Sequence, residues 1–188
     1  MKPVWDGIYD PEQVYYPEAD TYLLLDAALK EIRPEDRVLE IGTGSGYIAG
    51  ALKEVACVIA TDINPHAVIA AKQRGVEVVR TDLTHGLRGP FDLVIFNPPY
   101  LPTLDEEKID DWLEYALDGG MNGRRVIERF AACVDHVLTT RGRILLLVSS
   151  LTGIDEVQSI IRDMGYHREI VARRKMFDEE LVVLKCER

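Results

Sequence analysis

Short apolar runs that end in polar residues alternate with helix-like segments along most of this chain. Many of the runs are rich in β-branched residues, as in strands buried on both faces; they cover residues 37–41, 57–62, 77–82, 92–97 and 143–148. The helical patterns cover residues 21–32, the stretch after Gly46, and residues 65–74, 123–138 and 154–164. This alternation predicts an α/β fold with a doubly wound, mostly parallel sheet.

The C-terminal part of the chain has a different pattern. Residues 167–175 and 180–186 read as two strands, and only a short polar connection separates them. Because that connection has no room for a crossover helix, we expect an antiparallel hairpin. Residues 98–121 form an unusually long connection, in which we expect a small helix over residues 105–115. This connection follows a strand end, where open α/β sheets bind their ligands.

The size of the chain, its apolar runs and its net charge limit the classes of protein to which it can belong. The chain has 188 residues, 47% of them hydrophobic, which fits one globular domain over residues 1–188, with residues 1–20 as an extension on the cofactor and substrate side. The apolar runs, such as residues 144–148, are far too short to span a membrane, and residues 1–6 lack the apolar core of a signal peptide. We therefore expect a cytoplasmic protein. A formal net charge of −10 argues against binding to nucleic acid.

Cysteine and histidine residues give no metal-binding pattern. The three cysteines and four histidines show no ligand spacing; they are Cys57, Cys133, Cys186, His66, His85, His136 and His167. We expect no metal, reduced cysteines and packing or surface roles for the histidines. The acidic residues within 105–111 favour a solvated helix face, and they could also attract a basic substrate.

A glycine-rich turn follows the first apolar run. Gly42, Gly44 and Gly46 lie between this strand and a helix, where backbone without a Cβ atom lets a small ligand approach closely. The pattern can be fitted to a dinucleotide fingerprint through Gly44, Gly46 and Ala49, but Gly42 and Glu40 then have no role. The glycines could also serve only as a tight turn between strand and helix.

Acidic residues end the next two strands. Asp62 lies 20 residues after Gly42, the separation at which a carboxylate can accept both hydroxyls of an adenosine ribose. Asp82 could accept the adenine amino group while Leu83 packs on the ring, or Asp82 could cap the following turn. Glu40 could bind the ammonium of an amino-acid tail, which a nicotinamide cofactor does not have. These acids favour S-adenosylmethionine.

The segment Asn97-Pro98-Pro99-Tyr100 follows the fourth strand, where cofactor and substrate would meet. The two prolines fix φ and remove two donors, which leaves the Pro98 carbonyl as an acceptor beside the side-chain oxygen of Asn97. Two acceptors indicate a planar NH₂ group, either an amide or an exocyclic amine, on which Tyr100 would stack. The alternative is a simple turn that closes the strand.

These motifs together resemble class I S-adenosylmethionine-dependent methyltransferases of the HemK type, which methylate the glutamine amide in the Gly-Gly-Gln loop of peptide release factors. The resemblance rests on residues 14–21, 23–26, 61–65, 81–83, 97–100 and 119–124. It is to the short archaeal and eukaryotic branch, which lacks the N-terminal helical domain of bacterial members. Two departures are Ala19, where that branch usually has an acid, and Leu117, where it often has tryptophan.

The resemblance implies a Rossmann-like sheet of seven strands and assigns residues to the site. Cofactor contacts would come from Thr21, Glu40, Gly42, Gly44, Asp62, Asp82, Leu83 and Asn97, and substrate contacts from Asn97, Pro98, Pro99 and Tyr100, of which Asn97, Pro98 and Tyr100 would be catalytic. For Thr21, an N-cap of the first helix is the alternative. A small zinc-binding activator protein would form a heterodimer by adding a strand beside residues 76–80 at the sheet edge, and a self-sufficient monomer is the alternative.

Several other functions remain open from the sequence. An adenine-N6 methyltransferase acting on DNA or RNA would use the same tetrapeptide, although the acidity of the chain argues against it. A lysine ammonium is a poorer target because it must first lose a proton and is not planar. A nucleoside-binding module and a nicotinamide-dependent reductase are further alternatives, which the tetrapeptide disfavours.

Overall fold

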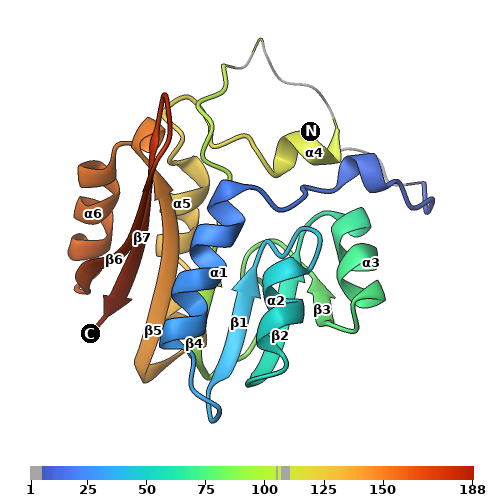
Figure 1. Cartoon of the computed structure of the whole chain (residues 1–188), viewed down its shortest axis with the longest axis horizontal. Coiled ribbons are helices and arrows are strands. Elements are labelled where there is room, and N and C mark those ends of the chain that lie inside the picture. Colours follow the sequence, from blue (N-terminus) through green and yellow to red (C-terminus); the bar gives the residue numbers. More distant parts are fainter. Residues whose placement is uncertain (1–5, 105, 107–110) are drawn as a thin grey trace.

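The computed structural model describes residues 6–104, 106 and 111–188. Seven strands form one sheet in the order β3-β2-β1-β4-β5-β7-β6 (Figure 1). The strands are β1 Arg37–Ile41, β2 Cys57–Asp62, β3 Glu77–Arg80, β4 Phe91–Phe96, β5 Leu138–Ser149, β6 His167–Lys175 and β7 Glu180–Glu187. The helices are η1 Pro11–Gln13, α1 Ala19–Glu31, α2 Tyr47–Leu52, α3 Pro65–Gln73, α4 Trp112–Tyr115, α5 Arg125–Ala131, η3 Val134–Val137, η4 Ser150–Thr152 and α6 Ile154–Asp163.

The pairing of the strands confirms the predicted fold class. Strand β1 pairs in parallel with both β2 and β4, and β2–β3 and β4–β5 are also parallel pairs. Strand β7 is antiparallel to both β5 and β6, so the predicted C-terminal hairpin continues the sheet beyond β5 and ends it at β6. The carboxyl ends of β1, β2 and β4 therefore lie together at one edge of the sheet.

Helices cover both faces of the sheet. Successive residues of a strand point to opposite faces, and apolar side chains on each face pack against helices. On one face, Val38 and Leu93 belong to a buried cluster with residues of α1, α2 and α3. On the other face, Leu39 and Val94 pack in a second cluster with Phe130 of α5 and residues of α6. This double burial explains why the strands read as continuous apolar runs.

The predicted helix over residues 123–138 was wrong in its extent. Helix α5 ends at Ala131, a short 3-10 turn follows, and Leu138 already belongs to β5, where it pairs with Phe91. Gly123 has φ +71°, which excludes it from a right-handed helix. The first residues of β5 are largely polar and partly exposed. The apolar run in the sequence therefore indicated only the buried second half of this strand.

The end of β3 and the extent of the helix after β4 also differ from the sequence prediction. Strand β3 stops at Arg80, and Asp82 lies in a turn that the His85 N–H closes on the Asp82 carbonyl at 3.0 Å. In the connection after β4, the small helix is limited to α4, whereas residues 105 and 107–110 of the predicted helix lie outside the described residues. Asp111 caps α4 by accepting the Glu114 N–H at 2.8 Å.

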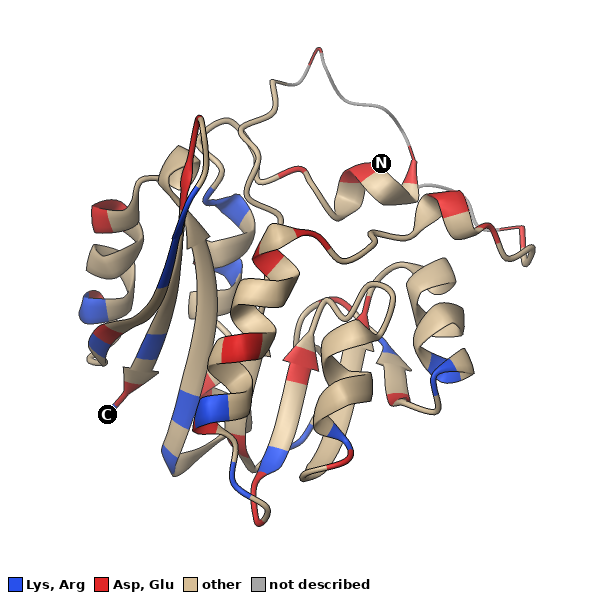
Figure 2. Ribbon diagram, viewed as in Figure 1, with Lys and Arg blue, Asp and Glu red and all other residues tan. Residues whose placement is uncertain are grey.

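The two edges of the sheet differ in character. Strand β3 forms one edge, as predicted, and its Val79 side chain is 43% exposed. Strand β6 forms the other edge and carries Arg173, Arg174 and Lys175 as exposed cations. In the ribbon of Figure 2, basic positions are coloured blue on the hairpin, and acidic positions are coloured red on several segments near the top of the view. Within the described ranges, no helix has the length and apolar character that crossing a membrane requires.

A buried ion pair joins the turn between α1 and β1 to strand β5, at the end of the sheet away from the carboxyl ends of β1 and β4. Arg143 donates to Asp36 at 2.6 Å, and the two side chains are 6% and 4% exposed. Arg143 also donates to the Glu31 carbonyl at 3.0 Å, and Asp36 accepts the Arg33 N–H at 2.8 Å. Since both charges are shielded from water, removing one leaves the other buried without its counter-charge.

We expect Asp36→Ala to lower the free energy of unfolding by about 3–5 kcal/mol, because Arg143 would remain buried and uncompensated. Asp163→Ala removes the acid of an exposed pair with Arg162 and should change it by less than about 1 kcal/mol. Urea unfolding of both variants measures the difference. Equal changes in the free energy of unfolding would show that the buried pair contributes no more to stability than the exposed pair.

Candidate functional site

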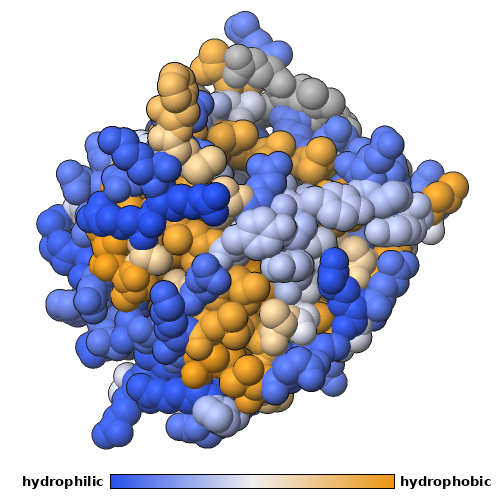
Figure 3. Space-filling model, in the orientation of Figure 1, coloured by the Kyte–Doolittle hydropathy of each residue, from blue (hydrophilic) through white to orange (hydrophobic). Residues whose placement is uncertain are grey.

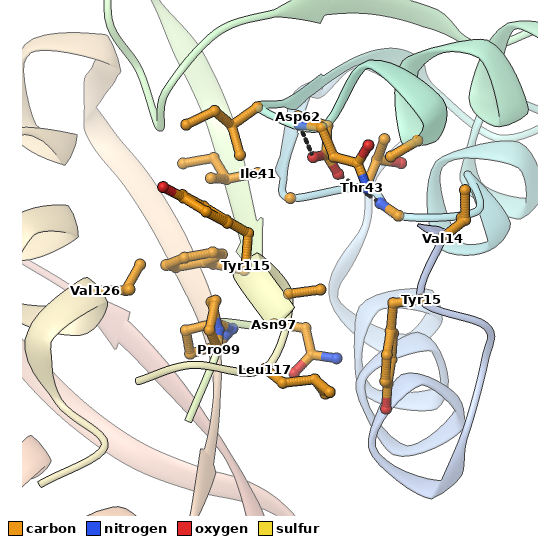
Figure 4. Close-up of a pocket in the computed structure, with 18 of the residues that line it drawn as sticks. Val14, Tyr15, Ile41, Thr43, Asp62, Asn97, Pro99, Tyr115, Leu117 and Val126 are labelled. Carbon is orange, nitrogen blue, oxygen red and sulfur yellow. Dashed lines mark hydrogen bonds between the residues drawn. The ribbon is translucent and has the colours of Figure 1, made fainter. Parts of the chain in front are cut away.

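A cavity of about 1130 Å³ opens at the carboxyl ends of β1, β2 and β4. Figure 4 shows Asp62 and Thr43 toward one end of it and Asn97 and Leu117 toward the other. The structure brings every predicted site residue to its wall: Thr21, Glu40, Gly42, Gly44, Asp62, Asp82, Leu83, Asn97, Pro98, Pro99 and Tyr100. The extension before α1 also lines it, through residues that include Val14 and Tyr15. The cavity is large enough for a nucleoside and a substrate side chain together.

Glu40 holds the glycine turn between β1 and α2 through two hydrogen bonds. Its Oε2 accepts the Thr43 hydroxyl at 2.5 Å and the Ala49 N–H at 3.0 Å, which fixes the turn to the start of α2. Gly46 is required by packing, since a Cβ atom there would lie 2.7 Å from the Ala71 Cα of α3. Both bonds to Glu40 end on Oε2, so Oε1 is the oxygen that a ligand can meet.

Burial controls the charge of Glu40. The side chain is 4% exposed, and this burial raises its pKa to about 8, against the lowering effect of the Thr43 and Ala49 bonds. Asp62 adds a smaller repulsion that raises the same pKa further. A cationic group beside Glu40 would reverse this trend, because an opposite charge favours the ionised carboxylate.

Asp62 ends β2 and connects the two neighbouring turns. It accepts the Gly44 N–H at 2.9 Å on Oδ2 and the Asn64 N–H at 2.8 Å on Oδ1. Burial raises the pKa of Asp62 to about 6, and these backbone bonds oppose the increase. Both oxygens are oriented by the backbone, so the carboxylate is held in one fixed position at the cavity wall.

Asp82 and Leu83 lie on the far wall of the cavity. The Asp82 carboxylate accepts Nη2 of Arg129 at 2.8 Å, so α5 helps to hold it, a contact that the sequence did not predict. The Asp82 carbonyl closes the turn, and Asp82 also lines the cavity, so its contact with an adenine stays a prediction. Leu83 has φ +51°, an unusual value for a residue with a Cβ atom, and such residues often occur at ligand sites.

The tetrapeptide after β4 places Asn97 beside the cavity. Its Nδ2 donates to Oδ2 of Asp20 at 3.1 Å, while its Oδ1 is buried and has no hydrogen-bond partner among the described residues. Pro98 is buried, whereas Pro99 and Tyr100 are half-buried. An unpaired buried acceptor costs about 1–3 kcal/mol. A donor that enters with a ligand would remove that cost.

Sequence reasoning gave no individual role to Asp20 and Tyr15, which belong to a hydrogen-bond network with the tetrapeptide. Asp20 is 3% exposed and accepts the Tyr15 hydroxyl at 2.9 Å and the Tyr100 hydroxyl at 3.5 Å. Thr21 is not the N-cap of α1, because that helix begins at Ala19 and Glu18 is its cap; Thr21 donates its own N–H and hydroxyl to Asp20 at 2.5 and 3.2 Å. The signal was an acid at the first turn of a helix, which usually indicates only a favourable helix dipole.

The donor and acceptor set fits S-adenosylmethionine. Acids lie at or near the ends of β1 and β2, as the ammonium and ribose of that cofactor require, and Gly42 and Gly44 adopt φ +66° and +53° between them. A Cβ atom on Gly44 would lie 3.2 Å from the Tyr15 carbonyl, so the cradle favours glycine there. The described residues contain no cluster of His, Cys, Asp or Glu able to hold a metal ion.

The buried state of Glu40 makes a pH-dependent prediction. Its pKa is about 8 in the folded protein, whereas the ordinary value for an exposed glutamate is 4.5, so the folded state keeps a proton that the unfolded chain releases. Stability from this group is therefore complete below pH 4.5 and is lost as pH rises to about 8. The side chain of Glu40→Gln cannot titrate. The free energy of unfolding of this variant, relative to wild type, should therefore increase by a few kcal/mol as pH rises through that range, at about 1.4 kcal/mol per pH unit.

Urea unfolding at a series of pH values measures this difference, with the exposed Glu54→Gln as the control. A stability difference between Glu40→Gln and wild type that stays constant from pH 4.5 to 8 would contradict the raised pKa.

Comparisons with known proteins agree with this site. The family model described as "Methyltransferase small domain" matches residues 18–111. A putative protein N5-glutamine methyltransferase of Methanocaldococcus jannaschii is 40% identical over 93% of this chain and 91% of its own length. Human methyltransferase HEMK2 is 34% identical, over 92% and 88% of the two chains.

A solved structure extends the likeness to the fold. The chain shares 33% identity and a TM-score of 0.80 with the structure of the E. cuniculi Mtq2–Trm112 complex, over 94% of this chain and 99% of the other. That complex is described as responsible for methylation of the translation termination factor eRF1. The predicted resemblance is thus confirmed, and the chain belongs to the family of protein N5-glutamine methyltransferases that includes HEMK2 and the release factor glutamine methyltransferases.

Proposed function

We propose that this protein transfers a methyl group from S-adenosylmethionine to the side-chain amide nitrogen of a glutamine in a peptide chain release factor. The observation that carries the proposal is the side-chain oxygen of Asn97, a residue that lines the cavity, because this buried acceptor has no partner among the described residues. An amide NH₂ supplies the missing donor. The names of the relatives support glutamine as the target residue and a termination factor as the substrate protein.

The residues that would hold the cofactor lie at the ends of β1, β2 and β3. Oε1 of Glu40 accepts the ammonium of the methionine part, and Asp62 accepts the ribose hydroxyls. Asp82 and Leu83 hold the adenine ring by a hydrogen bond and by packing, and Thr21, Gly42 and Gly44 form the remaining wall. When bound there, S-adenosylmethionine supplies an electrophilic methyl group on a sulfonium.

The tetrapeptide would hold the substrate amide. Oδ1 of Asn97 and the carbonyl of Pro98 accept the two hydrogens of the NH₂ group, and Tyr100 stacks on the planar amide. Accepting both hydrogens increases the electron density on a nitrogen that is otherwise a poor nucleophile. Holding that nitrogen in one orientation can contribute roughly 7–11 kcal/mol to catalysis.

No general base is required by this arrangement. A neutral amide nitrogen does not have to lose a proton before it reacts, and once methylated it is strongly acidic and releases a proton to water. Burial raises the pKa of Tyr100 above its ordinary value, and the charge of Asp20 adds to the increase. Tyr100 therefore keeps its proton and acts as a donor to Asp20 and as a flat surface.

A partner protein fits the edge of the sheet at β3. The short strand exposes the Val79 side chain at the edge opposite the basic hairpin. We propose that a small zinc-binding activator adds a strand here and forms a heterodimer with this chain, as the Mtq2–Trm112 complex supports. Release factors act at the ribosome, so the reaction belongs in the cytoplasm.

The main rival is methylation of the adenine N6 nitrogen in DNA or RNA. An adenine amino group carries the same two hydrogens and would satisfy Asn97 and Pro98 in the same way. The charge of the chain opposes it, because the net charge is −10 and Figure 2 marks acidic positions in red on several segments near the top of the view. A phosphate backbone would be repelled from such a surface.

Substrate choice tests the proposal directly. We expect the protein, with its activator present, to methylate a release factor from radiolabelled S-adenosylmethionine, at a glutamine that mass spectrometry identifies. A release factor in which that glutamine is replaced by alanine serves as the matched control. An adenine-containing oligonucleotide should remain unlabelled, and labelling of the oligonucleotide alone would establish the rival.

The role of Asn97 is tested by substitution. Asn97→Ala removes one of the two acceptors, so kcat should fall by about 10²–10³-fold. The dissociation constant for S-adenosylhomocysteine, measured by calorimetry, should change much less. Gln158→Ala removes an amide on α6, outside the cavity, and should leave turnover unchanged. Full turnover by Asn97→Ala would rule out its proposed role.

A further inference from the structure

Asp20 contacts two residues of the tetrapeptide, Asn97 and Tyr100. It belongs to the first turn of α1, whereas Asn97 follows β4, 77 residues later in the chain. Oδ2 of Asp20 accepts Nδ2 of Asn97 at 3.1 Å and the Tyr15 hydroxyl at 2.9 Å. A residue whose only function was to begin a helix would have no need of these partners.

The chemistry of this contact decides how the Asn97 side chain lies. An amide has nearly the same shape after its oxygen and nitrogen exchange places, so packing alone does not fix its orientation. A carboxylate only accepts hydrogen bonds, and therefore Nδ2 of Asn97 must face Asp20. Oδ1 is then forced to the other side, where it is buried and unpaired among the described residues.

We propose that Asp20 is a positioning residue that fixes the Asn97 amide with its oxygen toward the substrate nitrogen. The inference rests on the proposed function, in which that oxygen accepts the substrate amide. With the orientation reversed, Asn97 would present a donor to a donor, and the substrate NH₂ would lose one of its two acceptors. Asp20 thus acts on the reaction through Asn97.

The same contacts exclude a role for Asp20 as a general base. Its Oδ1 already accepts the Thr21 N–H and hydroxyl at 2.5 and 3.2 Å, and its Oδ2 accepts Tyr15 and Asn97. Burial raises the pKa of the Tyr15 hydroxyl well above its ordinary value, and the charge of Asp20 adds to this. Tyr15 therefore remains a donor, and the carboxylate has no accessible position for a substrate proton.

A reciprocal exchange of acid and amide tests the proposal. Asp20→Asn keeps the shape but lets the Asn97 amide take either orientation, so kcat should fall by about tenfold or more while cofactor affinity changes little. Asn97→Asp places two carboxylates in contact and should lower kcat further. In the double variant the introduced amide donates to the introduced carboxylate, whose second oxygen again accepts. Its kcat should exceed that of Asn97→Asp by about tenfold.

Matched measurements separate positioning from a purely structural role. Asp26→Asn alters an exposed acid on the same helix and should leave kcat, cofactor affinity and urea stability as in wild type. The side-chain NH₂ resonance of Asn97 in ¹⁵N-labelled protein should shift in Asp20→Asn and not in Asp26→Asn. Unchanged kcat in Asp20→Asn, or a double variant no better than Asn97→Asp, would overturn the proposal.

The outcome also distinguishes this inference from the proposed function. If Asn97→Ala retains full turnover, the function assigned to the tetrapeptide fails, and the role of Asp20 fails with it. If Asn97→Ala is inactive while Asp20→Asn is fully active, the proposed function stands and only the positioning role is lost. Urea midpoints of all variants establish that each comparison is made between folded proteins.

Discussion

Parallel pairing of β1 with both β2 and β4 is the constraint on which the site depends. Because all three strands run in the same direction, their carboxyl ends deliver Glu40, Asp62 and Asn97 to one edge of the sheet. The chain crosses from one side of β1 to the other between β3 and β4, and this reversal leaves room for a cavity. The glycine turn lies on one side of that cavity and the proline-rich turn on the other.

Much of this arrangement could be predicted from the sequence, because the strands are short, apolar and clearly ended. The bounds predicted for β1, β2 and β6 are those of the structure, and all predicted site residues line the cavity. Such runs are informative because strands covered on both faces must be apolar throughout. The local chemistry of Gly42 and of the Pro98-Pro99 pair likewise follows from residue type alone.

What the sequence could not provide are contacts between distant segments. Arg129 reaches Asp82 across 47 positions, and only the packing of α5 beside the sheet brings the pair together. Glu40 was predicted to bind a ligand, and the structure shows that one of its oxygens first holds its own turn. Helix α5 was predicted too long, because the buried valines Val134 and Val137 continue an apolar pattern through a 3-10 turn.

The two edge strands of the sheet, β3 and β6, differ in charge, and this difference affects where another protein can bind. Figure 3 shows apolar surface exposed over the region of α1 and α2, whereas much of the hairpin side is hydrophilic. The cationic outer strand β6 discourages further pairing by its charge, so lateral growth of the sheet is directed to β3 alone. The cavity lies between these edges. The activator proposed at β3 and the substrate proposed at the cavity would therefore occupy separate parts of the sheet, so neither would have to leave for the other to bind.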